Sequence, residues 1–305
     1  MDDKGPLVIL LHAINYWLKN NKIVPYSIRF LFGTDEETFS SDIKQFKKDF
    51  DQPKVVITPD ADFPVPYGEK GLMRFSVSQK IKNGNLLNIS AGSSTNAVAG
   101  KAIAVCKAQK QWIDVGNSRL SHAVKVNAIK DSFEIIAKGR GTHAADPYQG
   151  IDSIAILSHF LLEKDICNKQ EEEFFKFIIK IAGKPNGECV GLNVGDENFE
   201  RLTIVPTKLR LKNGSISQTF DVRFPMCTNP ELIRKKIEKH MPKGAIFKQI
   251  KAYPPFAINP ESKLVASLAK SYKDSTGEEP RKFTMGGATY ARNFDCGTSF
   301  GPIRE

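Results

Sequence analysis

Helical and strand-like segments alternate along the first 60 residues, and this order constrains the fold more than any other feature of the chain. Leucine and isoleucine recur at helical spacing over Lys4–Asn21, with Pro6 in the first turn. A short apolar run, Ser27–Phe32, predicts a strand. A helix capped by Ser40 or Ser41 and running to about Phe50 follows it, and then a second strand over Lys54–Thr58. This rhythm is typical of an α/β layer with a mainly parallel sheet.

The pattern changes after Gly68–Gly71. From there to about Pro254 the chain predicts strands in a meander together with several helices, which indicates an α+β composition. Beyond Pro254 the helix–strand pattern resumes. We therefore expect residues 1–70 and 252–305 to form one discontinuous α/β domain, and residues 71–251 to form an inserted α+β domain.

Composition excludes several classes of protein. The chain has 305 residues, of which 41% are hydrophobic and 26% charged, as in soluble globular proteins. No apolar run reaches the length of a membrane helix, so we expect no membrane partner and a cytoplasmic location. The five cysteines are scattered without a CxxC pair, which argues against a disulfide framework and against a thiolate zinc finger.

The chain is also basic, because 44 Lys and Arg exceed 34 Asp and Glu by 10. Such a balance can mark a nucleic-acid-binding protein, which would bind DNA or RNA tightly and in a salt-sensitive way. The lysines are spread among asparagine, isoleucine and glutamate, however, and form no arginine-rich stripe with aromatic residues. We therefore expect solvated helix faces and no nucleic-acid partner.

Carboxylates follow both predicted strands of the first 60 residues. Glu36 and Glu37 come after the first strand, and Asp60 comes after the second. Because parallel strands end at one edge of a sheet, these side chains are expected to gather there, and metal ions would relieve their repulsion. One aspartate of the pair Asp2–Asp3, before the first helix, would add a bridging carboxylate. A glutamate doublet alone is more often a surface feature. The prediction therefore depends on the occurrence of Asp2, Glu36–Glu37 and Asp60 together, each at the boundary of a predicted element.

Seven motifs together resemble a known family. They occur in order along the chain: Met1–Pro6, Phe32–Thr38, Thr58–Pro64, Gly68–Gly71, Thr142–Ala144, Asp221–Pro225 and Gly286–Arg292. They resemble the aminoacylase/carboxypeptidase/succinyl-diaminopimelate desuccinylase superfamily of zinc-dependent peptidases, and within it the PepV-like Xaa-His dipeptidases. The resemblance implies a zinc-peptidase-like catalytic domain with a mainly parallel sheet, and the inserted domain as its lid. It also implies a hydrolase, a metalloprotease that cleaves dipeptides. The length of the lid would let it cover the site within a single chain, so we expect a monomer.

The resemblance implies roles for individual residues. Glu36 is similar to the general base that takes a proton from the attacking water, and His143 to a lid histidine that stabilises the oxyanion. Asp2 resembles a carboxylate that bridges two zinc ions, while Glu37 and Asp60 resemble ligands of one ion each. Manganese or cobalt would also suit such ligands.

Three further residues resemble substrate-binding residues. Asn96 is similar to a lid residue that contacts the substrate, and Arg292 to the residue that binds the substrate carboxylate. Arg223 resembles a residue whose role in binding the substrate carboxylate is related to that of Arg292. Taken singly, His143 is better explained as a cap of the following helix, and Arg292 as a surface arginine.

The resemblance finally implies one zinc-binding histidine upstream of Met1 and another beyond Glu305. We therefore expect a catalytic domain that is incomplete and truncated at both ends, with weaker metal binding and doubtful activity. The alternative is a catalytically inactive remnant that binds peptides or a partner chain. In that case substitution of Glu36 changes nothing measurable.

Overall fold

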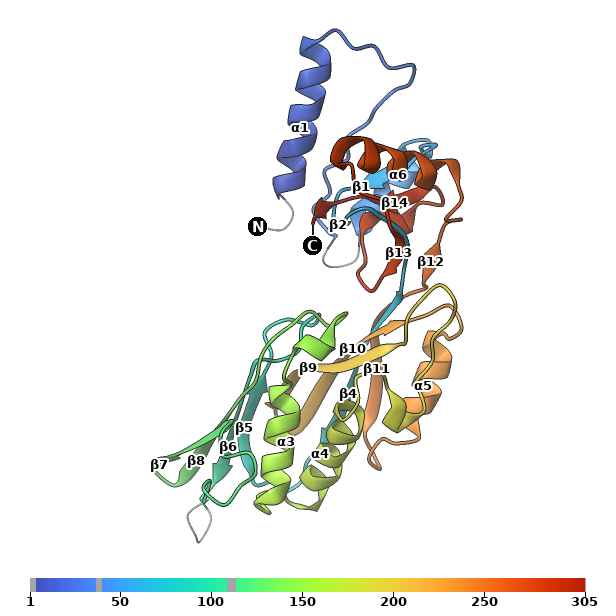
Figure 1. The fold of residues 1–305 in the computed structure, drawn as a ribbon. Helices are drawn as coiled ribbons and strands as arrows, with labels where there is room; N and C mark the ends of the chain where they lie inside the picture. The colour runs from blue at the N-terminus through green and yellow to red at the C-terminus, as the bar shows by residue number, and fades with distance from the viewer. Residues whose placement is uncertain (1–3, 37–39, 109–113, 305) are drawn as a thin grey trace. The chain divides into compact units, whose positions relative to one another are not determined.

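The computed structural model describes residues 4–36, 40–108 and 114–304 (Figure 1). The chain divides into two compact units. The discontinuous unit combines Met1–Glu69 with Phe256–Glu305, and the continuous unit comprises Lys70–Pro255.

The discontinuous unit is built from short, mainly parallel strand pairs. Its strands from the first segment are β1 (Val56–Thr58), β2 (Ala61–Asp62) and β3 (Val65–Glu69). Each pairs in parallel with a strand from the last segment, namely β14 (Gly297–Ser299), β15 (Pro302–Ile303) and β13 (Lys282–Met285). The fourth strand from that segment, β12 (Phe256–Ala257), pairs with β3 in the antiparallel direction. The predicted α/β class is therefore confirmed.

Two helices complete this unit. Helix α6 (Lys263–Thr276) begins at the N-cap Ser262, whose hydroxyl accepts from the backbone N–H of Val265. Its apolar face packs on Val65 of β3. Helix α2 (Ser41–Asp49) buries Ile43 and Phe46 against Phe294. Strands that lie far apart in sequence are thus joined by small local cores.

The N-terminal segment differs from the sequence-based expectation in one respect. The predicted first helix is present as α1 (Lys4–Lys19), but the predicted strand over Ser27–Phe32 is wrong. Residues 22–33, all of which the structure describes, form neither helix nor strand. A strand needs a neighbour for its N–H and C=O groups, and no described strand pairs with this segment. The turn that carries Glu36 therefore does not follow a strand end.

The continuous unit contains an eight-stranded sheet with the order β11-β4-β10-β9-β5-β6-β8-β7, and every pairing is antiparallel. These strands are β4 (Gly71–Lys80), β5 (Leu86–Ala91), β6 (Lys101–Lys107), β7 (Val124–Ile129), β8 (Ser132–Lys138), β9 (Thr203–Lys212), β10 (Ser215–Phe224) and β11 (Ile246–Tyr253). The long runs β4, β9 and β10 alternate between buried and more exposed side chains over part of their length, as expected for a sheet with one covered face.

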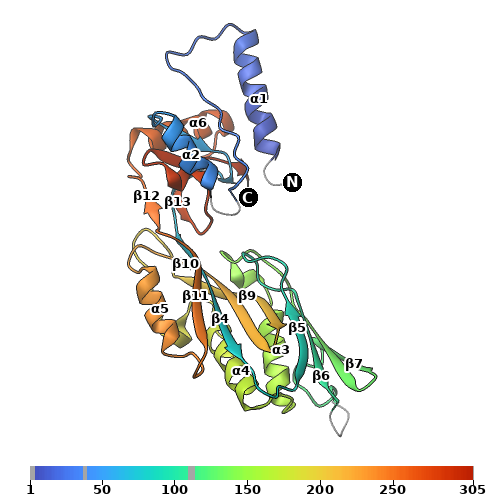
Figure 2. The same ribbon diagram turned by 180° about the vertical axis from the view of Figure 1, so that it is seen from behind.

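Helices cover one face of this sheet (Figures 1 and 2). They are α3 (Ser153–Glu163), α4 (Lys169–Ala182) and α5 (Pro230–Glu238), which share one buried cluster with the sheet. Phe75 and Phe220 stack at 5.0 Å between ring centroids, and Phe177 of α4 meets Phe220 edge-on. Because alternate residues of β4 and β10 point into this core, the residues between them lie on the opposite face.

Helix α4 is tied to the sheet by a buried carboxylate. Glu171 accepts from the backbone N–H groups of Asn168, Asn85 and Leu86 at 2.8, 3.1 and 3.0 Å. Asn168 caps the helix in return, which completes a capping box. One side chain thereby fixes both the start of α4 and the start of β5.

Among the described residues there is neither a membrane-spanning helix nor a disulfide bond. No helix formed by residues 4–36, 40–108 and 114–304 is long and apolar enough to cross a membrane. All five cysteines are described and each is a free thiol.

Candidate active site

In the discontinuous unit, the turn that carries Glu36 is held by hydrogen bonds to Asp42 and Tyr290. Asp42 Oδ2 accepts from the backbone N–H groups of Thr34 and Asp35 at 2.8 and 3.1 Å. The same oxygen accepts from the Tyr290 hydroxyl at 2.6 Å. Residue 290 belongs to the short 3-10 helix η3 (Tyr290–Asn293), so the C-terminal segment fixes the position of the acidic turn.

A glycine is required at the start of this turn. A Cβ atom on Gly33 would lie 2.0 Å from the Tyr290 hydroxyl oxygen and 2.6 Å from Asp42 Oδ2. Any larger residue would therefore push these two side chains apart and release the backbone before Glu36.

Hydrogen bonds stabilise the negative charge of Asp42. Burial raises the pKa of its carboxyl group, but hydrogen bonds from Tyr290, Thr34, Ile43 and Asp35 outweigh burial, so the pKa lies below its ordinary value. Burial and the bond to Asp42 also raise the pKa of Tyr290. The tyrosine hydroxyl is therefore the donor of this pair at neutral pH.

The structure describes two of the four carboxylates that were predicted to bind metal or to act as the general base. Glu36 is partly exposed at the end of the turn, and Asp60 is partly buried between β1 and β2. Asp2 and Glu37 lie outside the described residues. The structure therefore shows the position of two of these four predicted side chains.

Arg292, the predicted carboxylate-binding residue, lies in a buried polar cluster. Its Nε donates to Glu69 Oε2 at 2.9 Å, and the two side chains are 7% and 2% exposed. Thr289 donates to the same carboxylate through its backbone N–H at 3.1 Å and its hydroxyl at 2.6 Å. Glu69 thus holds the turn before η3 and the arginine that follows it.

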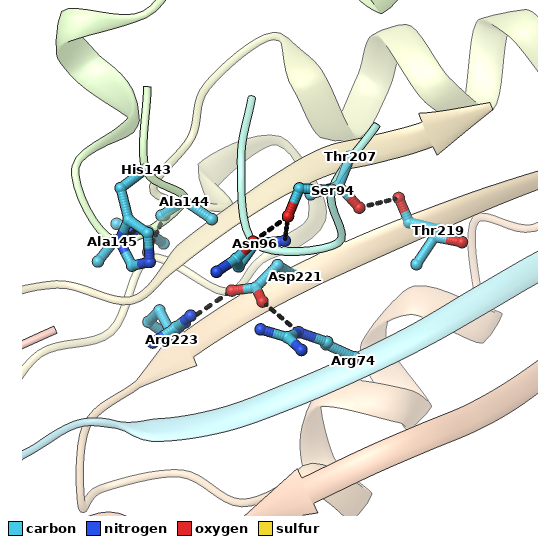
Figure 3. A network of polar contacts seen from close by, with 11 residues as sticks. Arg74, Ser94, Asn96, His143, Ala144, Ala145, Thr207, Thr219, Asp221 and Arg223 are labelled. Atoms are coloured by element: carbon cyan, nitrogen blue, oxygen red, sulfur yellow. Dashed lines mark hydrogen bonds and ion pairs between the residues drawn. The ribbon is translucent and has the colours of Figure 1, made fainter. Parts of the chain in front are cut away.

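In the continuous unit, Asp221 lies between two arginines (Figure 3). Its Oδ2 accepts from Nε of Arg74 at 2.8 Å, and its Oδ1 accepts from Nε of Arg223 at 2.7 Å. Arg74 lies on β4 directly opposite Asp221 on β10. Because Asp221 and Arg223 are two residues apart on one strand, all three side chains share the face of the sheet turned away from the core.

His143 lies beside this cluster and has a defined hydrogen-bonding state. Its Nδ1 accepts from the backbone N–H of Ala145 at 3.2 Å. A neutral imidazole that accepts at Nδ1 carries its proton on Nε2. Partial removal of water and the positive charge of Arg223 lower the pKa of the ring, with a further contribution from Arg74, while Asp221 and Asp146 oppose them. His143 is therefore a neutral donor at neutral pH.

Asn96 is brought to His143 by a short antiparallel contact. Ala97 and His143 form a β-bridge, and the backbone N–H of Ala144 donates to the Asn96 carbonyl at 2.8 Å. The Ser94 hydroxyl bonds to the Asn96 side-chain oxygen, which orients the amide (Figure 3). Residues 92–94 and 97–101 line a hollow of about 210 Å³ beside this loop. The structure thus gathers Asn96, His143 and Arg223, three of the predicted site residues.

The family model for "Peptidase family M20/M25/M40" matches residues 1–303. The chain belongs to this family. It is 26% identical over 317 residues to YtjP of Bacillus subtilis (strain 168), covering 99% of this chain and 68% of the relative. It is also 26% identical over 321 residues to the Beta-Ala-Xaa dipeptidase of Lactobacillus delbrueckii subsp. lactis, covering 100% of this chain and 67% of that one.

A solved structure supports the fold of this M20-family chain. Human carnosine dipeptidase 1 aligns with a TM-score of 0.51 at 10% sequence identity, covering 99% of this chain and 65% of that one. The chain thus spans slightly less than two thirds of the length of that structure. At this identity the likeness bears on the fold alone.

The described part of this M20-family chain contains no cluster of metal-binding side chains. Within residues 4–36, 40–108 and 114–304, no group of three or more His, Cys, Asp or Glu side chains could hold a metal ion. Asp60 is the one predicted ligand in these ranges. The other two predicted ligands, Asp2 and Glu37, lie outside these ranges.

Sequence reasoning missed three residues that the structure places at these sites. Arg74 and Asp42 lie outside the motifs singled out from the sequence, and Tyr290 lies within the motif Gly286–Arg292 but was given no role. Arg74 is found only through strand register, because its partner Asp221 is 147 positions away. Asp42 and Tyr290 are 248 positions apart. No local pattern joins residues at such separations.

Proposed function

We propose that this chain is a metal-dependent dipeptidase of the PepV-like, Xaa-His-cleaving kind. The match of the M20/M25/M40 peptidase family to residues 1–303 carries this proposal. The name of the Beta-Ala-Xaa dipeptidase among its relatives supports a dipeptide as the substrate.

Glu36 is the proposed general base. It would take a proton from the attacking water while the water oxygen bonds to the peptide carbonyl carbon. The same carboxyl group would then pass this proton to the leaving nitrogen as the C–N bond breaks, which leaves a carboxylic acid and an amine. The acid then gives up its remaining proton, so that the products at neutral pH are a carboxylate and an ammonium group. A turn held by Asp42 and Tyr290 supports this role, because a proton-transferring group must keep its position.

His143 is the proposed donor to the tetrahedral oxyanion. Its neutral ring fits this task, because Nδ1 accepts a hydrogen bond and Nε2 carries the proton that can be donated to the oxyanion. A preorganised donor of this kind contributes about 3 kcal/mol to transition-state stabilisation.

Asp2, Glu37 and Asp60 are the proposed ligands of two zinc ions, with manganese or cobalt as substitutes. Carboxylate oxygens are suitable donors for these ions, although Asp60 alone lies in the described residues. When bound, such ions supply Lewis-acid polarisation of the carbonyl group and a lower pKa of bound water.

Asn96, Arg223 and Arg292 are the proposed substrate-binding residues, and the continuous unit is the proposed lid. The buried ion pair between Arg292 and Glu69 gives this arginine a supporting partner rather than a freely moving side chain. We further propose a monomer in the cytoplasm, where its five free thiols would stay reduced.

The test compares Glu36→Gln with the unchanged chain. Both are purified, shown to be folded by circular dichroism, and assayed on Xaa-His dipeptides with added zinc or manganese. We expect kcat to fall on the order of 10²–10⁴-fold with KM little changed. Glu173→Gln, an exposed glutamate on α4, is the matched control. Equal turnover by the Glu36 variant, or no turnover by the folded unchanged chain, contradicts the proposal.

A further inference from the structure

A hollow of about 420 Å³ lies between α4 and the turn that joins α5 to β11. Its lining residues are Glu173, Lys176, Phe177 and Lys180 from α4, and His240, Pro242 and Lys243 from the turn. The α4 residues recur every three or four positions, so they share one side of the helix. The volume suits a small organic molecule rather than a single ion.

The hollow is separate from the candidate active site. Helix α4 packs on the core face of the eight-stranded sheet, whereas Asp221 and its two arginines lie on the other face. Among the described residues, none with a proposed catalytic, metal-binding or substrate-binding role lines the hollow.

Lys180 contacts a histidine instead of a carboxylate. Lys176 and Lys184, four positions before and after it, each pair with a glutamate four positions further away. Because helix neighbours stand three or four positions apart, and positions 176 and 184 are themselves cationic, Lys180 finds no opposite charge along its own segment. Its Nζ lies 3.0 Å from Nδ1 of His240, and no carboxylate in the described part of the chain forms an ion pair with it.

His240 accepts this hydrogen bond as a neutral ring. An ammonium group has donors only, so Nδ1 is the acceptor and the ring proton is on Nε2. Partial burial lowers the pKa of the ring, and the positive charges of Lys180, Lys239 and Lys236 lower it further. At neutral pH the ring therefore leaves the positive charge of Lys180 without compensation.

Positive charge exceeds negative charge around the hollow. Two glutamates are present, of which Glu173 lines the hollow and Glu172 pairs with Lys176. The lysines that line the hollow or act on His240 are Lys176, Lys180, Lys236, Lys239 and Lys243. These five positive and two negative charges leave an excess of three. A phosphate monoester, with a charge of about −1.5 to −2 at pH 7, is an anion that fits this excess.

We propose that this hollow binds a small organic molecule that carries a phosphate monoester, with Lys180 and His240 as the residues that bind the phosphate. Bound phosphate offsets the lysine charges around His240, so the ring takes up a proton and Nδ1 changes from acceptor to donor. Both groups then donate charge-assisted hydrogen bonds to phosphate oxygens. Phe177 and Pro242 provide apolar surface for the organic part.

Proton NMR of the His240 ring is the test, because the ring responds to the ligand directly and no hydrolysis needs to be observed. The full chain is titrated with phenyl phosphate at pH 7, with the ionic strength held constant by sodium chloride, and His240→Gln identifies the resonance. We expect a saturable shift and a higher pKa of His240 in the bound state. The absence of a saturable shift, or an equal shift when sodium chloride replaces the phosphate, overturns the proposal.

Two related anions test the chemical class of the ligand. Phenyl sulfate has the same shape with a single negative charge, and should bind about 5-fold more weakly. Inorganic phosphate lacks the phenyl ring, and should also bind more weakly than phenyl phosphate. Equal binding of phenyl sulfate overturns the assignment to a phosphate monoester, and equal binding of inorganic phosphate overturns the assignment to an organic molecule.

Lysine variants, each first shown to be folded by circular dichroism, test the site itself. Lys180→Gln should weaken the binding of phenyl phosphate about 5-fold, and Lys180→Arg, which keeps the charge, should weaken it less. Lys125→Gln, which removes the same charge from an exposed lysine on β7, should leave the binding unchanged. Equal weakening by Lys180→Gln and Lys125→Gln overturns the proposal, because it indicates a general attraction of anions to a basic chain.

Discussion

The backbone N–H of Ala145 donates to Nδ1 of His143. This contact is between residues two positions apart, so it persists as long as the local loop is folded. It leaves Nε2 as the donor of a neutral ring. His143→Ala should therefore lower kcat on the order of 10²–10³-fold, the usual cost of losing one oxyanion donor. Steady-state kinetics on a dipeptide tests this.

The matched control for that variant is His159→Ala, since His159 is an exposed histidine on α3. His143→Gln, which keeps a donor group, should retain more activity than His143→Ala. Equal activity in the unchanged chain and His143→Ala would show that the ring takes no part in the reaction.

The titration of His143 should reflect its cationic neighbours. Because partial desolvation and the charge of Arg223 lower its pKa, the ring should be neutral from about pH 6.5 upward. Removing one cation, as in Arg74→Gln, should raise this pKa. Proton NMR of the imidazole resonances against pH measures both values. A pKa at or above 6.5 in the unchanged chain would contradict this explanation.

Acid should weaken the turn that carries Glu36. The folded-state pKa of Asp42 lies below its unfolded value of 3.8, so this carboxylate stabilises the fold above pH 3.8. The contribution is lost as the pH falls through the folded-state pKa. Asp42→Asn should cost about 2 kcal/mol in free energy of unfolding at pH 7, and less below pH 3.8. Urea unfolding at pH 3 to 7 tests this, with exposed Asp295→Asn as control.

The effect of pH on stability through Asp152 should be opposite to the effect through Asp42. It caps α3 through Oδ1, whereas its buried Oδ2 has no hydrogen-bond partner among the described residues. Burial raises its pKa from 3.8 to about 7, although the backbone N–H groups of Ile154 and Ala155 oppose this. Since the folded state holds the proton more tightly, stability should fall as the pH rises from about 4 to about 7.

Asp152→Asn should remove this pH dependence, because asparagine caps a helix equally well and carries no charge. We expect the variant to be more stable than the unchanged chain at pH 8, by up to a few kcal/mol, and similar to it at pH 4. Thermal unfolding at both pH values measures the difference. A variant that is less stable at pH 8 would rule out a buried charge as the cause.

Regular elements were predictable where the sequence pattern was long. The spacing of leucine and isoleucine over Lys4–Asn21 predicted α1, and the strand expected over Lys54–Thr58 is present as β1. The apolar run Ser27–Phe32 looked equally strand-like, but it has no strand partner in the described residues. Strand formation depends on a neighbour, which a local pattern does not reveal.

The candidate site was predictable only in part. His143 and Asn96 were identified through the family resemblance, and the structure brings them together by a β-bridge between Ala97 and His143. Arg74 carries no motif of its own, and its meaning comes from register with Asp221. The roles of Glu36, Asp60 and Arg292 stay predictions, since geometry alone does not test them.

The division of the discontinuous unit has a consequence for the order in which the chain matures on the ribosome. Residues 70–255 form a continuous stretch that can fold as soon as it has been synthesised. Strands β1, β2 and β3 emerge before this stretch, yet their parallel partners β14, β15 and β13 are synthesised after it. The acidic turn must likewise wait for Tyr290. Glu36 is thus made before residues 70–255, yet it reaches its final position only after Tyr290 has been made.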